Sequence, residues 1–294
     1  MSFDLYFAGS QNKLAEEYMK NNGCNRLLSY YSDKSIIKQW VEFKKTKPDC
    51  ANKLFIDCGA YTAFTQGVVI DIDQYISYIN DIIDQVDIFA SLDIINGSGV
   101  EESDKKTYEN YLYIKQRIKD PHKLLPTYHQ GDRLEFLKLY LQDTDINYIA
   151  LGGLVGSNKA SLDAFFQKCY KTIQEIRPDI KVHAFGMTSK PLLNSYPFTS
   201  ADSTAWIMTG ANGGIMSPWG VINVSETQDN LQKNYKNLSK DSQDAIKKYV
   251  ENYGHTIQEC QTDYKVRCMI NIKYLYDFSK NHIPKLKPIR KSLF

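Results

Sequence analysis

Two aspartates in this sequence stand at the ends of short apolar stretches, and a third lies in another expected strand. Asp57 follows the stretch 54–56, Asp93 follows 88–92, and Asp202 lies in the stretch 200–206. A carboxylate beside a buried stretch is costly to desolvate unless it has a partner. A helix N-cap is the ordinary explanation for one such aspartate. Three aspartates with the same placement favour a chemical role.

Paired carboxylates suit substitution at the anomeric carbon of a sugar. One acid acts as nucleophile or charge stabiliser, and the other moves a proton to or from the leaving group. Metal binding is the competing use of three aspartates, and His129 and His183 are available to complete such a site. The residue types alone leave both uses open.

Glycines follow several of the same apolar stretches. Gly59 comes two residues after Asp57, Gly152 and Gly153 follow the stretch 147–151, and Gly186 follows Phe185. Glycines at these places let a flat ligand approach the backbone, although tight turns would require them equally well.

Short β-type stretches alternate with helical patterns along the first two thirds of the chain. The expected strands are 2–8, 26–31, 54–58, 87–95, 123–129, 147–151, 181–185 and 200–206. The expected helices between them are 11–21, 34–45, 72–86, 105–118, 134–141, 161–176 and 190–194. Eight strands alternating with helices predict a closed parallel barrel. The rival is an open doubly wound sheet, but the glycine-rich turn typical of that fold is absent from the sequence.

The last third of the chain has a different pattern. A loop rich in glycine and proline is expected at 210–218, followed by helical patterns at 226–253 and 261–278. The sequence therefore predicts a single domain over 1–294: a (β/α)8 TIM barrel at about 1–210 and a C-terminal helical extension at about 211–294. The final segment carries five basic residues, Lys280, Lys285, Lys287, Arg290 and Lys291. This segment is either a contact for a polyanion or a solvated tail.

The composition is that of an ordinary globular protein. The chain has 294 residues, 43% of them hydrophobic and 24% charged, and a net charge of +2, so any nucleic-acid contact must come from a local basic patch. A basic leader is missing and no apolar run reaches about 18 residues, which predicts a cytoplasmic protein without a membrane partner. Six scattered cysteines fit a reducing compartment. His255, Cys260 and Cys268 match zinc spacings poorly, so neither a metal nor another cofactor is expected.

Four segments in order carry a family resemblance. They are Asp57-Cys58-Gly59-Ala60-Tyr61, the stretch 151–156 (Leu-Gly-Gly-Leu-Val-Gly), Phe185-Gly186-Met187 and Asp202-Ser203-Thr204. Together they resemble the tRNA-guanine transglycosylase superfamily over about residues 54–206. They are most similar to the branch found in phages and genomic islands that inserts 7-deazaguanine bases into DNA. A phage-encoded member would act in the host cytoplasm.

The resemblance implies a base exchange through a covalent aspartyl-glycosyl intermediate. Guanine in DNA would be replaced by a free base such as 7-cyano-7-deazaguanine. Asp202 matches the nucleophile that attacks C1′, and Asp57 matches the general acid/base.

The resemblance also implies a base pocket. Asp93 would accept hydrogen bonds from N1 and the exocyclic amine of guanine. Gln130, or His129 in its place, would read the O6 edge, which the backbone of Gly152 and Gly153 would also face. The rings of Tyr61 and Phe185 would enclose the base, as a planar ligand requires.

Two departures from the family bear on the substrate. The Cys-x-Cys-x-x-Cys zinc motif of tRNA-type members is missing, and so is the basic insertion that follows their nucleophile. Both absences favour DNA over tRNA. The alternatives are the same exchange on tRNA, a non-catalytic nucleic-acid-binding subunit and, more remotely, a barrel glycoside hydrolase.

Overall fold

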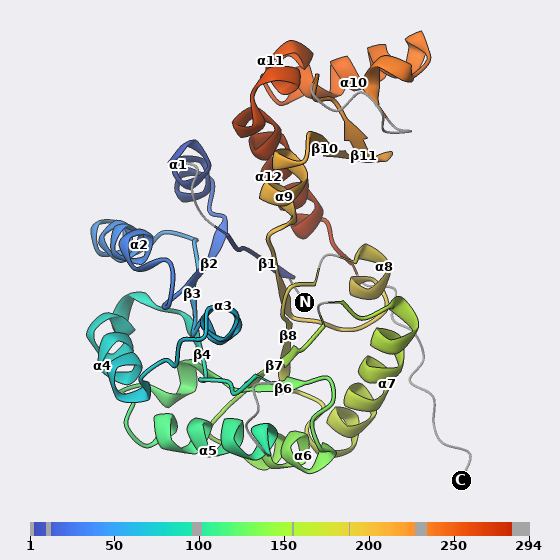
Figure 1. The fold of residues 1–294 in the computed structure, drawn as a ribbon. Helices are drawn as coiled ribbons and strands as arrows, with labels where there is room; N and C mark the ends of the chain where they lie inside the picture. The colour runs from blue at the N-terminus through green and yellow to red at the C-terminus, as the bar shows by residue number, and fades with distance from the viewer. Residues whose placement is uncertain are drawn as a thin grey trace.

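The computed structural model describes residues 3–9, 13–95, 102–154, 156–187, 189–226 and 234–283. Its main sheet consists of parallel strands in the order β5-β4-β3-β2-β1-β9-β8-β7-β6. The bounds are β1 Asp4–Phe7, β2 Asn25–Ser29, β3 Leu54–Asp57, β4 Ile88–Ala90, β5 Leu124–Leu125, β6 Thr127–His129, β7 Tyr148–Gly152, β8 Lys181–Ala184 and β9 Ser200–Ser203. The sheet curls into a nearly closed barrel (Figure 1), which confirms the predicted α/β barrel.

Nine strands occupy eight positions because Pro126 divides the predicted fifth strand. Proline has no N–H to donate to a neighbouring strand. The segment before it pairs with β4, where Ser91 N donates to Leu125 O at 2.9 Å, and the segment after it pairs with β7, where Ala150 N donates to Pro126 O at 2.8 Å. The two pieces together occupy the position between β4 and β7 and leave the barrel nearly closed.

Helices surround the barrel (Figure 1). Their bounds are α1 Lys13–Asn21, α2 Lys34–Thr46, α3 Ala60–Thr65, α4 Ile72–Ile82, α5 Ser103–Lys115, α6 Leu134–Gln142, α7 Lys159–Ile176, α8 Lys190–Leu193 and α9 Ala205–Ala211. Side-chain caps start several of them; for example, Asp71 accepts from Gln74 N at 2.9 Å at the start of α4. The sequence prediction missed α3 and α9. The expected strand to Trp206 was too long, since β9 ends at Ser203.

Two apolar layers fill the barrel. The larger lies between strands and helices. The smaller fills the barrel interior and consists of Tyr6, Ala8, Leu27, Phe55, Ala90, Leu125 and Ala150, with Ile88, Tyr148 and Phe185 packed against it. Because alternate residues of a strand face the interior, residues at the strand ends that continue this series face the barrel mouth.

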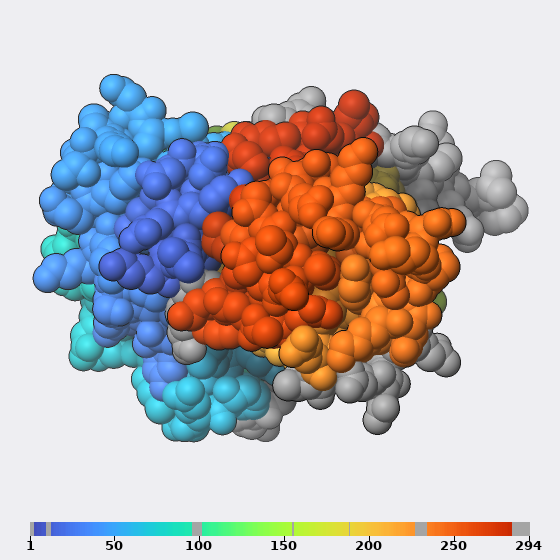
Figure 2. Space-filling model, turned by 90° about the horizontal axis from the view of Figure 1, so that it is seen from above, coloured from blue at the N-terminus to red at the C-terminus, as the bar shows by residue number. Residues whose placement is uncertain are grey.

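The C-terminal part packs beside the barrel as a unit with its own small core. It contains β10 (Gly214–Ser217), β11 (Gly220–Asn223), α10 (Lys240–Asn252), α11 (Ile257–Thr262) and α12 (Tyr264–Lys280). The first two form an antiparallel pair where the sequence predicted a loop, and α10 begins well after the expected start at 226. Helix α12 packs on α9, β1 and α1. Figures 1 and 2 show this unit next to the N-terminal residues of the barrel.

The two cysteines considered as zinc ligands lie in packed interiors. Cys260 belongs to the core of the C-terminal unit, and Cys268 sits against Gly210 so closely that a Cβ there would meet its Sγ at 2.6 Å. In the described ranges, His, Cys, Asp and Glu side chains do not gather in threes in a metal-binding arrangement. Among the same residues, every helix is too short or too polar to cross a membrane. The basic tail beyond Lys280 lies almost wholly outside the described residues.

Candidate active site

A cavity of about 420 Å³ opens at the C-terminal ends of the barrel strands. Its volume lies in the range of small-ligand sites. All nine residues to which the sequence analysis gave a catalytic or base-binding role line it. The full lining is Leu27, Asp57, Cys58, Ala60, Tyr61, Asp93, Ile95, His129, Gln130, Gly152, Gly153, Leu154, Phe185, Gly186 and Asp202.

Asp57 ends β3 and is held by the turn that follows. Its Oδ2 accepts a hydrogen bond from Gly59 N at 3.0 Å. Gly59 has a φ of 82°, and a Cβ at this position would meet Ser29 Oγ at 2.3 Å. Only glycine fits this turn. The turn starts α3, which carries Tyr61 to the cavity with 60% of its surface exposed.

The surroundings of Asp57 make its proton available near neutral pH. Burial raises the pKa of this carboxyl, the negative charges of Asp93 and Asp202 raise it further, and the hydrogen bond from Gly59 only partly offsets them, leaving the pKa at about 7. A carboxyl that titrates near 7 can both give and take a proton under ordinary conditions.

Asp93 lies opposite a charged histidine. His129 Nε2 is 3.2 Å from Asp93 Oδ2, and His129 Nδ1 is 3.4 Å from Asp132 Oδ2. Burial by itself lowers the pKa of His129, but the two carboxylates outweigh burial and raise it to about 10. The imidazole is therefore a cation at neutral pH. Asp93 Oδ1 is buried and accepts no hydrogen bond from the described residues, so it is open to a donor from a ligand.

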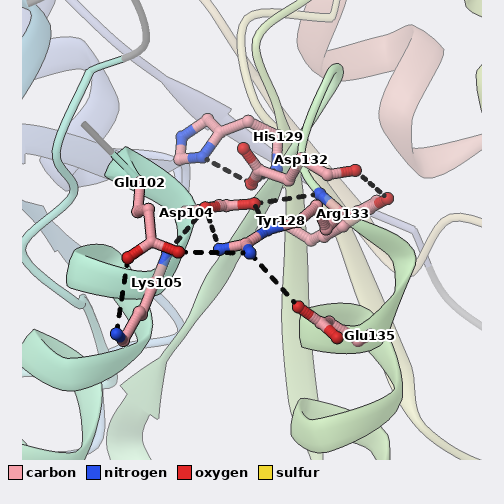
Figure 3. Close-up of polar contacts among 8 residues, drawn as sticks. All are labelled: Glu102, Asp104, Lys105, Tyr128, His129, Asp132, Arg133 and Glu135. Atoms are coloured by element: carbon pink, nitrogen blue, oxygen red, sulfur yellow. Dashed lines mark hydrogen bonds and ion pairs between the residues drawn. The ribbon is translucent and has the colours of Figure 1, made fainter. Parts of the chain in front are cut away.

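The loop after β6 is fastened on both sides of His129 (Figure 3). Asp132 accepts from the backbone N of His129 at 2.8 Å, and Tyr128 Oη donates to the carbonyl of Asp132 at 2.9 Å. The side chain of the next residue, Arg133, donates twice to Asp104 at the start of α5, at 2.8 and 2.9 Å. These hydrogen bonds lower the pKa of Asp104 to about 2, so the pair stays charged. The loop holds the His129 ring before any ligand arrives.

The carboxylate of Asp202 has two distinct oxygens. Oδ1 accepts from Gly186 N at 2.6 Å and lies 3.3 Å from His183 Nε2. Oδ2 has no hydrogen bond to the described residues, while the side chain lines the cavity. Asp202 is only 6% exposed. One oxygen is anchored by the protein and the other is left for a ligand.

Two glycines bring the backbone of β7 close to the cavity. A Cβ at Gly152 would meet Thr127 Cγ2 at 2.8 Å and His129 Cδ2 at 2.9 Å, and Gly153 has a φ of 72°. Any side chain at 152 would displace the His129 ring. Gln130, in contrast, already has partners: its Nε2 donates to Ser161 Oγ and its Oε1 accepts from Ser157 Oγ, both at 2.7 Å. Its amide retains one N–H for a ligand.

The two predicted aromatic walls come from different elements. Phe185 follows β8 and packs against Phe55 and His183, with ring centroids 5.7 and 4.7 Å apart. It is fixed, whereas Tyr61 on α3 is largely exposed.

Three further polar residues support the site; the sequence analysis did not name Asp132 or Ser200 and considered His183 only as a metal ligand. Asp132 holds His129, while His183 and Ser200 lie beneath Asp202. Ser200 and Asp202 are two residues apart, and the alternation of a strand places both on the interior face. That spacing was the available signal for Ser200.

Comparison of the chain with models of known protein families gives no match, and comparison with curated proteins gives none either.

Proposed function

We propose that this chain is a transglycosylase that exchanges guanine in DNA for a free 7-deazaguanine base. The observation that carries the proposal is the unequal surroundings of three carboxylates around one cavity. Asp202 has one free oxygen, Asp57 has a pKa of about 7, and Asp93 has a buried oxygen without a donor. A nucleophile, a proton carrier and a base-binding acceptor need these three different states.

The first half-reaction displaces guanine. Asp202 Oδ2 attacks C1′ and forms a C–O bond while the bond from C1′ to N9 breaks and its electron pair goes to the base. Protonated Asp57 gives its proton to the departing base, so guanine leaves neutral and Asp57 becomes a carboxylate.

The second half-reaction reverses these roles. The incoming base loses its N9 proton to Asp57, its nitrogen attacks C1′, and the bond to Asp202 breaks. Two displacements on opposite faces retain the configuration at C1′. Asp57 ends protonated and Asp202 ionised, as at the start.

The Asp93 side of the cavity suits the polar edge of guanine. N1–H and the exocyclic amine are donors, and the open oxygen of Asp93 is a buried acceptor. The His129 cation lies 3.2 Å from the other oxygen of Asp93. The O6 acceptor would meet the remaining N–H of Gln130 or backbone N–H groups of the β7 turn. Deazaguanines share this edge with guanine, so one pocket would serve both the leaving and the entering base.

DNA is the preferred substrate on the sequence alone. The cysteine zinc motif and the basic insertion of tRNA-type relatives are missing from this chain. The C-terminal unit instead carries α10 to α12 around a small apolar core.

The test is incorporation of radiolabelled guanine by the purified protein into double-stranded DNA, single-stranded DNA and unmodified tRNA in parallel. The expected result is label in DNA, with a covalent protein–DNA adduct on denaturing gels when no free base is added. Label in tRNA alone would keep the chemistry and refute the choice of substrate. Label in none of the three, with no adduct, would refute the proposed function. Nucleoside mass spectrometry of DNA from cells with an intact deazaguanine pathway would identify the inserted base.

A further inference from the structure

A chain of buried polar groups runs from Asp202 into the barrel. His183 Nδ1 lies 2.5 Å from Ser200 Oγ, and Ser200 Oγ lies 2.5 Å from the hydroxyl of Tyr148. His183 is 0% exposed, and β8 and β9 pair it directly with Ser200. The base exchange described above uses none of these three residues.

The chemistry of the chain fixes the direction of its hydrogen bonds. As the attacking carboxylate of the proposed reaction, Asp202 can only accept, so His183 Nε2 must carry a proton to donate to it. In a neutral ring Nδ1 is then an acceptor, and Ser200 must donate to it. Tyr148 in turn donates to Ser200. Burial raises the pKa of Tyr148, which keeps its hydroxyl protonated.

Aromatic rings hold His183 in place. Tyr6, Phe55 and Phe185 pack edge-on against it, with centroid distances of 6.1, 5.0 and 4.7 Å. These neighbours and its complete burial restrict the ring. The proton on Nε2 therefore stays aimed at Asp202.

We infer that His183, fixed in its Nε2–H form by Ser200 and Tyr148, is a positioning residue that aims the free oxygen of Asp202 at the reacting carbon. This inference rests on the proposed function. Gly186 N and His183 Nε2 both contact Oδ1, which opposes rotation of the carboxylate and leaves Oδ2 for the reacting carbon. A carboxylate oriented in advance reacts faster than one that must first reorient.

Three variants test whether His183 acts by orienting Asp202 or only by packing in the barrel. His183→Leu removes both ring nitrogens, His183→Gln keeps a donor and an acceptor about as far apart as those of imidazole, and Ser200→Ala removes the donor to Nδ1. Single-turnover adduct formation with a guanine-containing DNA is measured for each variant, together with DNA affinity and thermal unfolding.

We expect His183→Leu to slow the adduct step by about 10²–10³-fold and Ser200→Ala by about 10-fold. His183→Gln should stay within about 10-fold of wild type, and DNA affinity should not change in any variant. A wild-type adduct rate in folded His183→Leu overturns the inference, as does a Gln variant as slow as the Leu variant. If His183→Leu does not fold, Ser200→Ala and His183→Gln decide.

A readout independent of activity separates this inference from the proposed function. Long-range ¹H–¹⁵N NMR of histidine-labelled protein identifies the His183 ring as the one whose signals are missing from His183→Gln, and these signals should come from a neutral ring protonated at Nε2 only. An Nδ1–H form of the His183 ring at neutral pH overturns the inference even if the enzyme is active. If wild-type protein forms no adduct with any nucleic acid while the Nε2–H form is present, the proposed function fails and the arrangement of His183 stands.

Discussion

Charged side chains are buried around Arg26 and at the barrel mouth, and the two regions differ in how these charges are paired. Between the barrel and its first helices, Arg26 is 0% exposed and pairs with Glu16. Its Nε donates to Glu16 Oε2 at 3.0 Å, and its other nitrogens reach Glu16 Oε1 and the carbonyls of Phe7, Gly9 and Leu27. Trp40 Nε1 donates to Glu16 at 2.8 Å. At the barrel mouth, by contrast, Asp57, Asp93 and Asp202 surround one cavity, and His129 is the one cation among its described lining residues.

The difference separates charges that hold the fold from charges kept ready for a ligand. A buried ion pair with its hydrogen bonds satisfied costs little to keep, and removal of either partner is expensive. Clustered carboxylates with open oxygens are unfavourable for the fold and persist where binding or catalysis uses them. Substitutions should therefore affect stability at the first region and activity at the second.

The largest effect is expected from Asp202→Asn. The amide removes the attacking oxygen while leaving the volume and the contact with Gly186, so the covalent adduct should fall by more than about 10⁴-fold with DNA affinity unchanged. Denaturing gels of protein incubated with DNA and no free base measure it.

Asp57→Asn is the matched control for that experiment. It removes the proton carrier and not the nucleophile, so adduct formation should slow by about 10²–10⁴-fold without being abolished. An adduct in Asp202→Asn that is missing in Asp57→Asn would show that the two roles are reversed.

The second effect concerns the satisfied pair. Glu16→Gln leaves Arg26 buried without its counter-charge and should lower the free energy of unfolding by about 3–5 kcal/mol. Urea unfolding measures it. The neighbouring Glu17→Gln, on the exposed side of α1, should change stability by less than about 0.5 kcal/mol. If Glu16→Gln and Glu17→Gln have equal free energies of unfolding, the buried pair does not hold the fold, and the distinction between the two regions fails.

The sequence predicted the aspartates at the barrel mouth but not the buried pair of Glu16 and Arg26, for a physical reason. Parallel strands bring their carboxyl ends to one edge, so polar residues after apolar stretches converge whatever the register. Asp57, Asp93 and Asp202 could be placed on that ground alone. The pair of Glu16 and Arg26 depends on how α1 packs on β2, and spacing in the sequence carries no such information.

Other differences between the prediction and the structure also have physical reasons. The contact of His183 with Ser200 needs the register of β8 and β9, which the sequence does not state. The β10–β11 hairpin has two strands of four residues, each beginning with a glycine, so its composition indicates a loop. The break at Pro126 could have been predicted from the missing N–H of proline.

The third effect is expected at the base pocket. Asp93→Asn replaces the open carboxylate oxygen with a group that cannot accept from both guanine donors, which should cost about 2–4 kcal/mol of transition-state stabilisation. The ratio kcat/KM for guanine exchange measures it, with exposed Asp49→Asn as control. Stability should change by no more than about 1 kcal/mol, because His129 keeps Asp132 as a partner. Wild-type exchange in this variant would exclude Asp93 from base recognition.

The smallest effect is a pH dependence of stability that belongs to Asp57. Its pKa is about 7 in the folded protein and about 4 in an unfolded chain. Because the folded state binds this proton more tightly, the stabilisation it gives is complete below pH 4 and is lost as pH rises through 7. Asn cannot ionise. The difference between the free energy of unfolding of Asp57→Asn and that of wild type should therefore increase between pH 5 and pH 8. Water in the open cavity screens part of the charge, which limits the increase to about 2 kcal/mol. Urea unfolding of both proteins at the two pH values measures this increase. His129 is present in both proteins, so its own contribution to the pH dependence of stability largely cancels. An equal difference at pH 5 and pH 8 would mean that Asp57 is ionised throughout, and the mouth would then lack the proton that the departing base requires.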